Sequence, residues 1–509
     1  MNPIQLSGIK NPSWPRARGA KTKRNGKTVD LLSRDWDAYP SSIASLRGGH
    51  PFSKLPLYSA VAICGMLLAS TSRAADASQT ATAPALPQKP AWLTDLSIGV
   101  KESYDDNVYL SGVVPANKPI PDGGVLALKN HSSFVTTVSP KLGFNFAPLL
   151  GDQKVLQALT FAYAPEFVTY HDADTESYNA HRLSANVKGH VDDFSFSLEN
   201  GFNYINGSKE GASYTSGLTA YGTGILRERR EQFQDRNTLT LKYDQEKWFV
   251  RPTASLLNYN LNAKQLAGYT GYQNYADRYD VNGGADAGYK LNKDLALTLG
   301  YRYGSQYQQT YSKAIDALGE SASGDYQRVL LGLEGKPISW LDVKVQGGPD
   351  FRHYGDAAPV SDYNPTTYYG EAAVTATLSK QDALSFNYRQ WQWVSSTGKV
   401  PYFDSTYDLN YKHKFNDKFS GNLEGRLLGS DYTSGLTKNH DVNAPVNARN
   451  DLYYTVSAGL QYSFNANFSA NVAYTYDLAR NGQDGLSAAT VAPREFDHQL
   501  ISLGVSFKY

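Results

Sequence analysis

Three histidines, His131, His171 and His181, have serines and carboxylates close by in the sequence. The neighbours are Ser132, Ser133, Asp172, Asp174 and Ser184. A serine, a histidine and a carboxylate in contact could perform nucleophilic hydrolysis, but proximity in sequence does not establish the geometry of a triad. The sequence also has no phosphate loop, no Cys/His metal-ligand spacing and no dinucleotide fingerprint. We therefore expect no enzymatic activity, no catalytic residue and no bound cofactor.

A short acidic motif, Tyr104-Asp105-Asp106-Asn107, offers two carboxylates and an amide, which are ligand types that calcium accepts. The same residues suit a turn at the end of a strand, because Asp and Asn side chains bond their own backbone. The turn is the simpler interpretation, and we predict no metal site.

The chain ends on an alternation of apolar with small or polar residues from Ser502 to Tyr509. In a strand this pattern directs one row of side chains to lipid and the other to water. The ending resembles the C-terminal signal by which bacterial outer-membrane β-barrels are recognised for insertion. Ser502, Gly504, Phe507 and Tyr509 fill its polar, glycine and aromatic places, so we expect the barrel assembly machinery as a partner. An edge strand of a soluble sheet is the alternative.

The composition is compatible with a membrane β-barrel. A mean hydropathy of −0.47 over 509 residues is ordinary for a soluble protein, but only alternate residues of a barrel strand face lipid, which keeps the average low. The chain has 37 Tyr and 20 Phe against one Cys and two Met. These counts favour a β-rich wall with aromatic belts over a helix-packed core.

The N-terminal region predicts export. Residues 54–74 combine a positive flank, an apolar run and small residues before a cut, as in a secretory signal peptide. We interpret residues 1–53 as a basic polar extension or a misassigned start, and 75–92 as a disordered lead-in. Cleavage after Ala74 would remove Cys64, the one cysteine, and would leave 38 basic and 45 acidic residues. The resulting net charge of −7 argues against a nucleic-acid partner.

Residues 93–509 repeat one unit, in which alternating runs are joined first by a short Asp/Asn/Lys-rich turn and then by a long polar loop. The short turns fall at 148–154, 191–193, 244–247, 291–294, 337–340, 380–382, 416–418 and 465–467. Eight such turns predict an all-β fold, a transmembrane antiparallel up-and-down β-barrel of about 18 strands (16–18), with short periplasmic turns and long extracellular loops. A β-propeller would also alternate, but the sequence lacks its blade signature.

The alternation also assigns side chains to the two faces of the wall. Basic residues predominate in the rows expected to face the lumen, and the candidate pore-lining residues are Arg302, Arg328, Lys344, Arg389 and Arg426. Such a lining favours anionic solutes. Alternatively, these charges pair across strands and have no selective role, and a register error of one residue would exchange the two faces.

A barrel of this size is too wide for side chains alone to fill, so we expect a water-filled channel. The segment 75–92 is too short for a globular plug, and the loops near 105–130 and 207–230 are the candidates by length for a constriction. Trp391 and Trp393 share the expected inward face and could stack on sugar rings. An interfacial aromatic belt is the simpler interpretation of the two tryptophans.

The first predicted strand, Leu96 to Tyr109, resembles the opening of the bacterial β-barrel porin type 2 family, through Tyr104-Asp105-Asp106-Asn107-Val108. The resemblance covers residues 93–509 and implies an outer-membrane barrel without fixing a substrate. We therefore expect a protein of the cell outer membrane, surrounded by outer-membrane lipid, that acts as a porin-like channel for passive diffusion of small hydrophilic solutes and favours anions. The alternative is a duct for exopolysaccharide export.

Overall fold

In the computed structural model, all the described strands lie within the unit Pro87–Tyr509. The described residues are 89–110, 117–119, 125–127, 131–150, 155–207, 231–260, 277–309, 323–354, 366–393, 401–432, 449–483 and 495–509. The predicted extension, the signal peptide and most of the lead-in lie outside them. Within these ranges, no helical segment has the length and apolar character that a bilayer-spanning helix requires.

The unit is built almost entirely from strands. Their bounds are β1 Leu93–Asp105, β2 Asn117–Pro119, β3 Val125–Ala127, β4 Ser133–Asn145, β5 Leu156–Tyr170, β6 Tyr178–Val191, β7 Phe194–Asn206, β8 Gln232–Asp244, β9 Trp248–Asn260, β10 Asp277–Asn292, β11 Leu295–Gln309, β12 Gly324–Ile338, β13 Leu341–Tyr354, β14 Thr366–Thr377, β15 Asp382–Trp393, β16 Tyr402–Lys414, β17 Phe419–Tyr432, β18 Arg449–Ser463, β19 Phe468–Gln483 and β20 Phe496–Lys508. Two 3-10 helices, η2 Ala147–Leu149 and η3 Asp174–Glu176, lie in connections.

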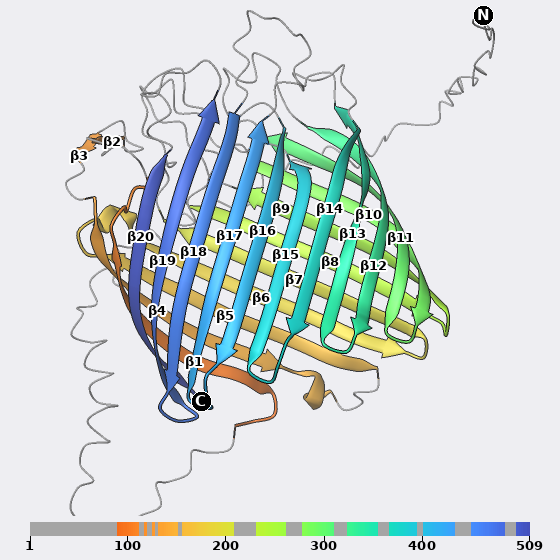
Figure 1. The fold of residues 1–509 in the computed structure, drawn as a ribbon, viewed down its shortest axis with the longest axis horizontal. Coiled ribbons are helices and arrows are strands. Elements are labelled where there is room, and N and C mark those ends of the chain that lie inside the picture. Colours follow the sequence, from red (N-terminus) through yellow and green to blue (C-terminus); the bar gives the residue numbers. More distant parts are fainter. Residues whose placement is uncertain are drawn as a thin grey trace, which may run out of the picture. The chain divides into compact units, whose positions relative to one another are not determined.

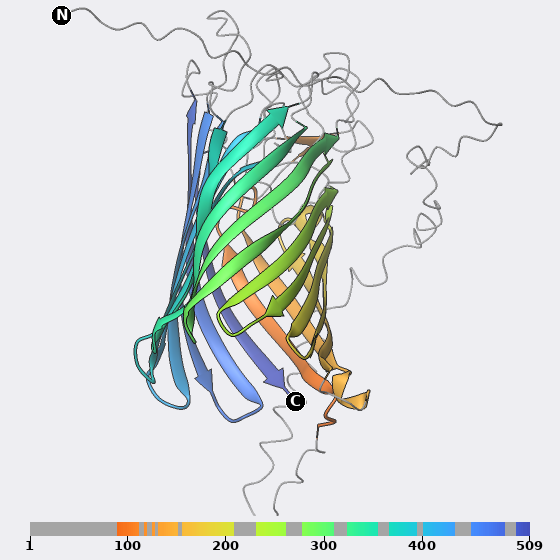
Figure 2. The same ribbon diagram turned by 90° about the vertical axis from the view of Figure 1, so that its right-hand side faces the viewer.

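Eighteen of the described strands form one closed sheet, and β2 pairs with β3 in a separate hairpin. From β4 to β20 each strand pairs antiparallel with the next in sequence. β1 pairs with both β4 and β20, which closes the ring. Figures 1 and 2 show the tilted strands passing around the barrel, with β15 to β20 in front of β5 to β8 in Figure 1. The predicted 18-stranded antiparallel barrel is confirmed.

The first and last barrel strands form the closing seam. Their register runs from Ser97 opposite Lys508 to Asp105 opposite Leu500. At the end of the chain, the backbone N–H of Tyr509 donates to a carbonyl of the segment that begins β1, at 2.9 Å. Because a closed sheet leaves no edge, no row of backbone groups in this wall has to face hydrocarbon unpaired.

Short turns join the strand pairs at the end of the barrel where both β1 begins and β20 ends, at all eight predicted positions. As the sequence predicts, Asp and Asn side chains stabilise these turns. Asn416 Oδ1 accepts from the backbone N–H groups of Lys418 and Phe419, both at 2.9 Å, and Asp192 adopts a left-handed φ of 49°. In the β16–β17 turn, Lys414 donates to Asp417 at 2.7 Å, which lowers the pKa of this exposed carboxyl group.

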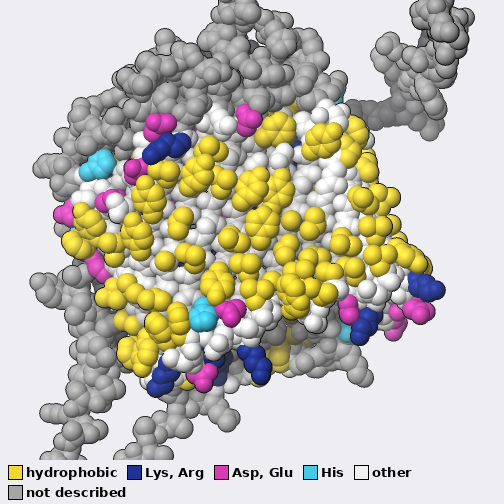
Figure 3. Space-filling model, in the orientation of Figure 1, with side chains coloured by type: hydrophobic (Ala, Val, Ile, Leu, Met, Phe, Trp, Pro, Cys, Tyr) yellow, Lys and Arg dark blue, Asp and Glu magenta, His cyan; other side chains and the backbone are white. Residues whose placement is uncertain are grey.

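The outer face of the barrel is apolar between two polar rims. On β20, Ile501 and Leu503 are 54% and 63% exposed, whereas Ser502 between them is 7% exposed. Figure 3 shows hydrophobic side chains over the middle of the wall and charged side chains near its upper and lower edges. On β13, Val345 is exposed outward, whereas Lys344 lines an interior cavity. The described strands therefore follow the predicted assignment of faces.

We predict that the two faces respond oppositely to the same substitution. Val456, near the middle of β18, is 51% exposed on the outer face, and Val456→Arg should lower the unfolding free energy by roughly 2–4 kcal/mol. Its neighbour Ser457 lines an interior cavity, so Ser457→Arg should be mild. Urea titration of both variants in lipid vesicles measures the difference, and equal losses would show that the faces are misassigned.

We also predict that replacing Phe507 and Tyr509 together with Ser blocks assembly. Phe507 packs on Phe468 with ring centroids 4.9 Å apart, so the change removes both the expected insertion signal and apolar contacts of the closing strand. The double variant should accumulate in the periplasm and be degraded, as cell fractionation with immunoblotting would show. A normal yield in the outer membrane would contradict this role for the two aromatics.

Candidate functional site

The inward side chains of β8 to β15 surround a cavity of about 340 Å³, here named the basic cavity. Arg302, Arg328, Lys344 and Arg389 line it. An adjoining cavity of about 350 Å³ shares Lys344 and Arg389 and adds Arg426. The structure thus places all five candidate pore-lining residues on the interior face of the wall.

The cations of the basic cavity divide into two groups. Arg251 and Arg302 pair with Asp286 at 3.0 and 2.8 Å, and Arg251 also forms a bidentate pair with Glu334. Arg328 pairs with a buried carboxylate on β13. The remaining cations of this lining, Arg236, Lys344 and Arg389, form no ion pair with any described residue.

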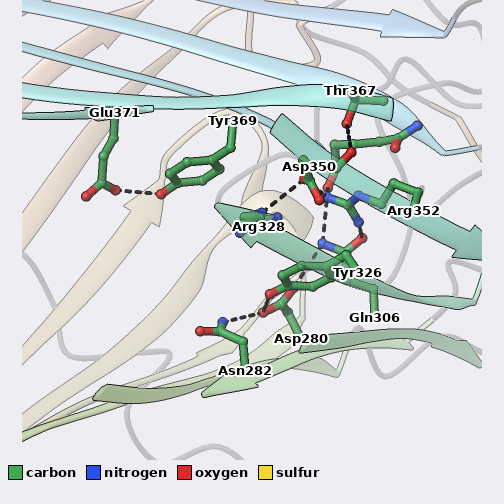
Figure 4. A network of polar contacts seen from close by, with 11 residues as sticks. Asp280, Asn282, Gln306, Tyr326, Arg328, Asp350, Arg352, Thr367, Tyr369 and Glu371 are labelled. Carbon is green, nitrogen blue, oxygen red and sulfur yellow. Dashed lines mark hydrogen bonds and ion pairs between the residues drawn. The ribbon is translucent and has the colours of Figure 1, made fainter. Parts of the chain in front are cut away.

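A buried charged network packs the interior beside β10 to β13 (Figure 4). Asp350 is 0% exposed and accepts hydrogen bonds from Arg328 Nε at 3.0 Å and Arg352 Nη2 at 2.7 Å. Both guanidinium groups lie over the ring of Tyr326, 4.0 and 4.6 Å from its centroid. A carboxylate placed between two cations offsets the cost of removing all three charges from water.

The network continues onto β10 and β11. Arg352 Nη1 donates to Gln306 Oε1, and Gln306 Nε2 donates to Asp280 Oδ2, both at 2.9 Å. The Tyr326 hydroxyl donates to the other oxygen of Asp280 at 2.9 Å. Asp280 supplies a second buried carboxylate against Arg328 and Arg352, so the network is close to neutral and holds its strands rigidly.

β14 and β15 separate after Gly370 and Gln390, the last pair in their register on the side away from the short turn that joins them. Beyond this point β14 pairs with β13 alone and β15 with β16 alone. The carbonyl oxygen of Gln392 instead accepts from Arg352 Nη2 at 2.9 Å and from Gln306 Nε2 at 3.1 Å. Side chains of the network therefore take the place of a neighbouring strand.

Above the same separation, an aromatic cluster crosses the interior. Trp391 and Trp393 stack with centroids 4.4 Å apart and are 8% and 2% exposed. They pack with Tyr402 of β16 and with Leu257 and Tyr259 of β9, a strand that is not their neighbour in the sheet. The interpretation of the two tryptophans as an interfacial belt is wrong, because both lie inside the barrel wall.

The rest of the lumen is more open. A cavity of about 670 Å³ lies between β1, β4 and β5 on one side and β16 to β20 on the other, and one of about 780 Å³ adjoins the β18–β19 turn. Arg426 lines both the first of these and the cavity that contains Lys344 and Arg389. Through Arg426, the cavity that holds Lys344 and Arg389 adjoins this larger space.

Among the described residues, side chains of β9 to β16 pack into the interior through the buried network and the aromatic cluster. Of the loops named as candidates for a constriction, 207–230 lies outside the described residues except at its first position, and so does most of 105–130. Their contribution stays a prediction.

The acidic motif at the end of β1 is a strand-ending turn, as its simpler interpretation predicts. Asp105 Oδ1 accepts from the backbone N–H of Asn107 at 3.0 Å. Asp106 Oδ1 accepts from the backbone N–H of Gln499 at 2.6 Å, and Asn107 Nδ2 donates to the carbonyl of Asp497 at 2.9 Å. The motif thus extends the β1–β20 seam beyond the last backbone pair.

Asp105, Asp106 and His498 each place a possible metal-ligand atom within 4.8 Å of the others. His498, however, contacts a carboxylate with each ring nitrogen, Asp105 at 3.2 Å and Asp477 at 2.8 Å. These contacts join β1, β19 and β20, and they engage the atoms that a cation would need. We assign the cluster to the seam.

The three histidines with nearby serines do not converge. His131 lies 3.4 Å from a backbone carbonyl, His171 contacts Thr136 Oγ1 at 2.8 Å, and His181 contacts the Tyr163 hydroxyl at 2.8 Å. Among the contacts of the described residues, none of the three forms a serine–histidine–carboxylate arrangement. The prediction that the chain is not an enzyme stays a prediction.

Sequence reasoning missed most of the buried network. Arg328 is among the residues expected to line the lumen, but Asp350, Gln306 and Tyr326 receive no role from the pattern. A signal was present, because Asp350 and Arg352 are two positions apart and therefore share a face. Their packing against β10 and β15 depends on wall curvature, which alternation does not encode.

No protein-family model and no curated protein matches the chain. Similar solved structures include Pseudomonas aeruginosa OpdK with vanillate (9% identity, TM-score 0.38, 82% of this chain and 98% of that chain covered). They also include P. aeruginosa OccK2 in complex with glucuronate (10%, 0.37, 81% and 98%) and the siderophore receptor PirA from P. aeruginosa (8%, 0.33, 83% and 81%). Sequence identities and TM-scores this low establish neither a shared family nor a shared substrate. The porin type 2 resemblance stays a prediction.

We predict that Asp350→Ala lowers the unfolding free energy by about 3–5 kcal/mol, because it leaves two buried guanidinium groups without their carboxylate. The matched control is Asp408→Ala. Asp408 pairs with Arg426 at 2.9 Å, but both side chains are well exposed to the lumen, and losing such a pair costs within about 1 kcal/mol. Urea titration in vesicles compares the variants, and similar losses would show that Asp350 is not the centre of the network.

Proposed function

We propose that the protein is an outer-membrane channel for the passive diffusion of small hydrophilic solutes, with a preference for anions. The observation that carries the proposal is the set of unpaired cations in the basic cavity. Arg236, Lys344 and Arg389 face the interior without an ion pair among the described residues. Because the wall has a low dielectric, such charges lower the energy of an entering anion more than they would in open water.

The paired and unpaired cations have different tasks in this proposal. Arg328 and Arg352 are buried with Asp350 and hold the packed side of the interior. Arg389 and Lys344 line the basic cavity and the cavity that adjoins it, and can exchange hydration water for contacts with a solute. Transport would then need no bound cofactor and no energy source, since each contact is weak enough to be released.

The outer face supports the proposed location in the cell outer membrane. Exposed apolar side chains between polar rims match a lipid bilayer. We expect outer-membrane lipid and the barrel assembly machinery as partners, the latter through Ser502, Gly504, Phe507 and Tyr509.

Export of a polysaccharide is less well supported. Sugar rings stack on free aromatic faces, but Trp391 already lies between Trp393 and the guanidinium of Arg389, which is 4.6 Å from its ring centroid. Trp393 in turn has Arg278 over its ring at 5.0 Å. No observation among the described residues favours this second function.

Single-channel recording in planar bilayers tests the proposal. The wild-type protein should give ion-conducting steps with anion preference, and Arg236→Gln, Lys344→Gln and Arg389→Gln together should move the reversal potential toward cation preference. The shift should fade at 1 M salt, where the screening length is about 3 Å.

The control removes one ion pair without changing net charge, through Asp408→Asn with Arg426→Gln, and should leave the reversal potential unchanged. An unaltered potential in the triple variant at low salt would refute the selective role of the three cations. Absence of conductance in the wild type would refute the open channel.

A further inference from the structure

A polar cluster lies on the outer face of β7 and β8. Asn200 Nδ2 donates to Asp235 Oδ1 and to Asn237 Oδ1, both at 2.8 Å. Asn237 Nδ2 donates to the second oxygen of Asp235 at 2.8 Å. The three side chains thus form a closed hydrogen-bonded set that contains one carboxylate.

The register establishes that this cluster points away from the lumen. Arg236 and Thr238 of β8 line the basic cavity, so the residues between and beside them, Asp235 and Asn237, face outward. Leu239, on the same outward row, is 39% exposed. Asn200 lies opposite Asn237 in the β7–β8 register and shares its face.

The cluster lies within the apolar band and not at its rim. Toward the turn end of the strands, Leu198 and Leu239 are exposed on the same rows. Toward the loop end, Phe202 and Phe233 pack edge to face with centroids 4.9 Å apart. Lipid tails offer no hydrogen bond, so a carboxylate at this depth is unfavourable unless something other than lipid covers it.

Among the described residues, no cation pairs with Asp235. It receives hydrogen bonds from two amides. Glu102, another outward carboxylate, contrasts with it, because Thr136 donates to Glu102 at 2.6 Å and His171 lies 3.7 Å away. Lipid tails cannot bond these polar groups, whereas a protein surface with amide donors and acceptors can, which points to a protein surface as the cover.

We propose that a second copy of this chain covers the cluster, so that the barrel is a homo-oligomer whose copies meet on the outer face of β7 to β10. Asparagine amides carry donors and acceptors together, which makes the surface able to pair with itself. Beside the cluster, Pro252, Ala254 and Ala285 are small and exposed outward, and small side chains let two walls approach closely. The inference rests only on the membrane location of the proposed function, not on conduction.

Native mass spectrometry of the full-length protein, extracted from outer membranes in mild detergent, tests the proposal. The wild type should be mostly oligomeric. Ala254→Trp adds a bulky side chain that lipid tolerates but a neighbouring copy does not, and it should convert the protein mostly to monomer at the same concentration. Val456→Trp, on the outer face of β18, is the matched control and should remain oligomeric.

A second variant separates loss of contact from loss of fold. Replacing Asn200, Asp235 and Asn237 together with Leu makes the surface apolar, so it should give a monomeric barrel that keeps the heat-modifiable migration of the folded wild type. A monomeric wild type, an oligomeric Ala254→Trp variant, or a monomeric Val456→Trp variant would each overturn the proposal. Because mass is measured without transport, these results are independent of the channel recordings.

Discussion

Closure of the sheet between β1 and β20 is the constraint on which the other features depend. In hydrocarbon an unpaired strand edge is too costly, so 18 described strands must each hold two neighbours. Closure then fixes the facing of every side chain, because successive residues alternate between lipid and lumen. The seam is reinforced where backbone pairing ends, because Asp105, Asp106 and Asn107 of one side contact His498, Gln499 and Asp497 of the other. The charged lining follows from this geometry, because every second residue of each strand points into the lumen and many of these residues are charged.

Closure alone does not explain why the interior has a packed side and an open side. The packed side follows from buried charges on β10 to β13, which must satisfy one another once they leave water. Asp350 serves two guanidinium groups, and Tyr326 provides a ring for both. On the open side, pairs such as Asp408 with Arg426 stay hydrated. Packing therefore rigidifies one half of the wall, whereas the other half borders the larger cavities.

Much of the fold could be predicted from the sequence, because alternation and turn chemistry are local. The turns built on Asp192 and Asn416, and the inward row that contains Lys344, follow from neighbours two or three positions away. Contacts across the lumen could not be predicted in this way. Alternation predicts that Trp393 faces inward, but it does not predict the contact with Tyr259, which lies on β9, a strand far from β15 in the sheet. Such pairings depend on how sharply the wall curves, which is a property of the whole ring.

Backbone hydrogen bonding between neighbouring strands is interrupted at two places in the wall. Between β4 and β5 the register is interrupted where Pro140 lies opposite Pro165, and neither proline has an N–H to donate. Each keeps its pairing on the other side, so the break stays short. Between β14 and β15 the strands part, and Arg352 and Gln306 bind the Gln392 carbonyl instead. Because Arg352 also binds the buried Asp350, the wall and the packed interior there depend on one guanidinium group. That coupling argues against a gate at this break, because moving the two strands further apart would take a buried guanidinium group away from Asp350.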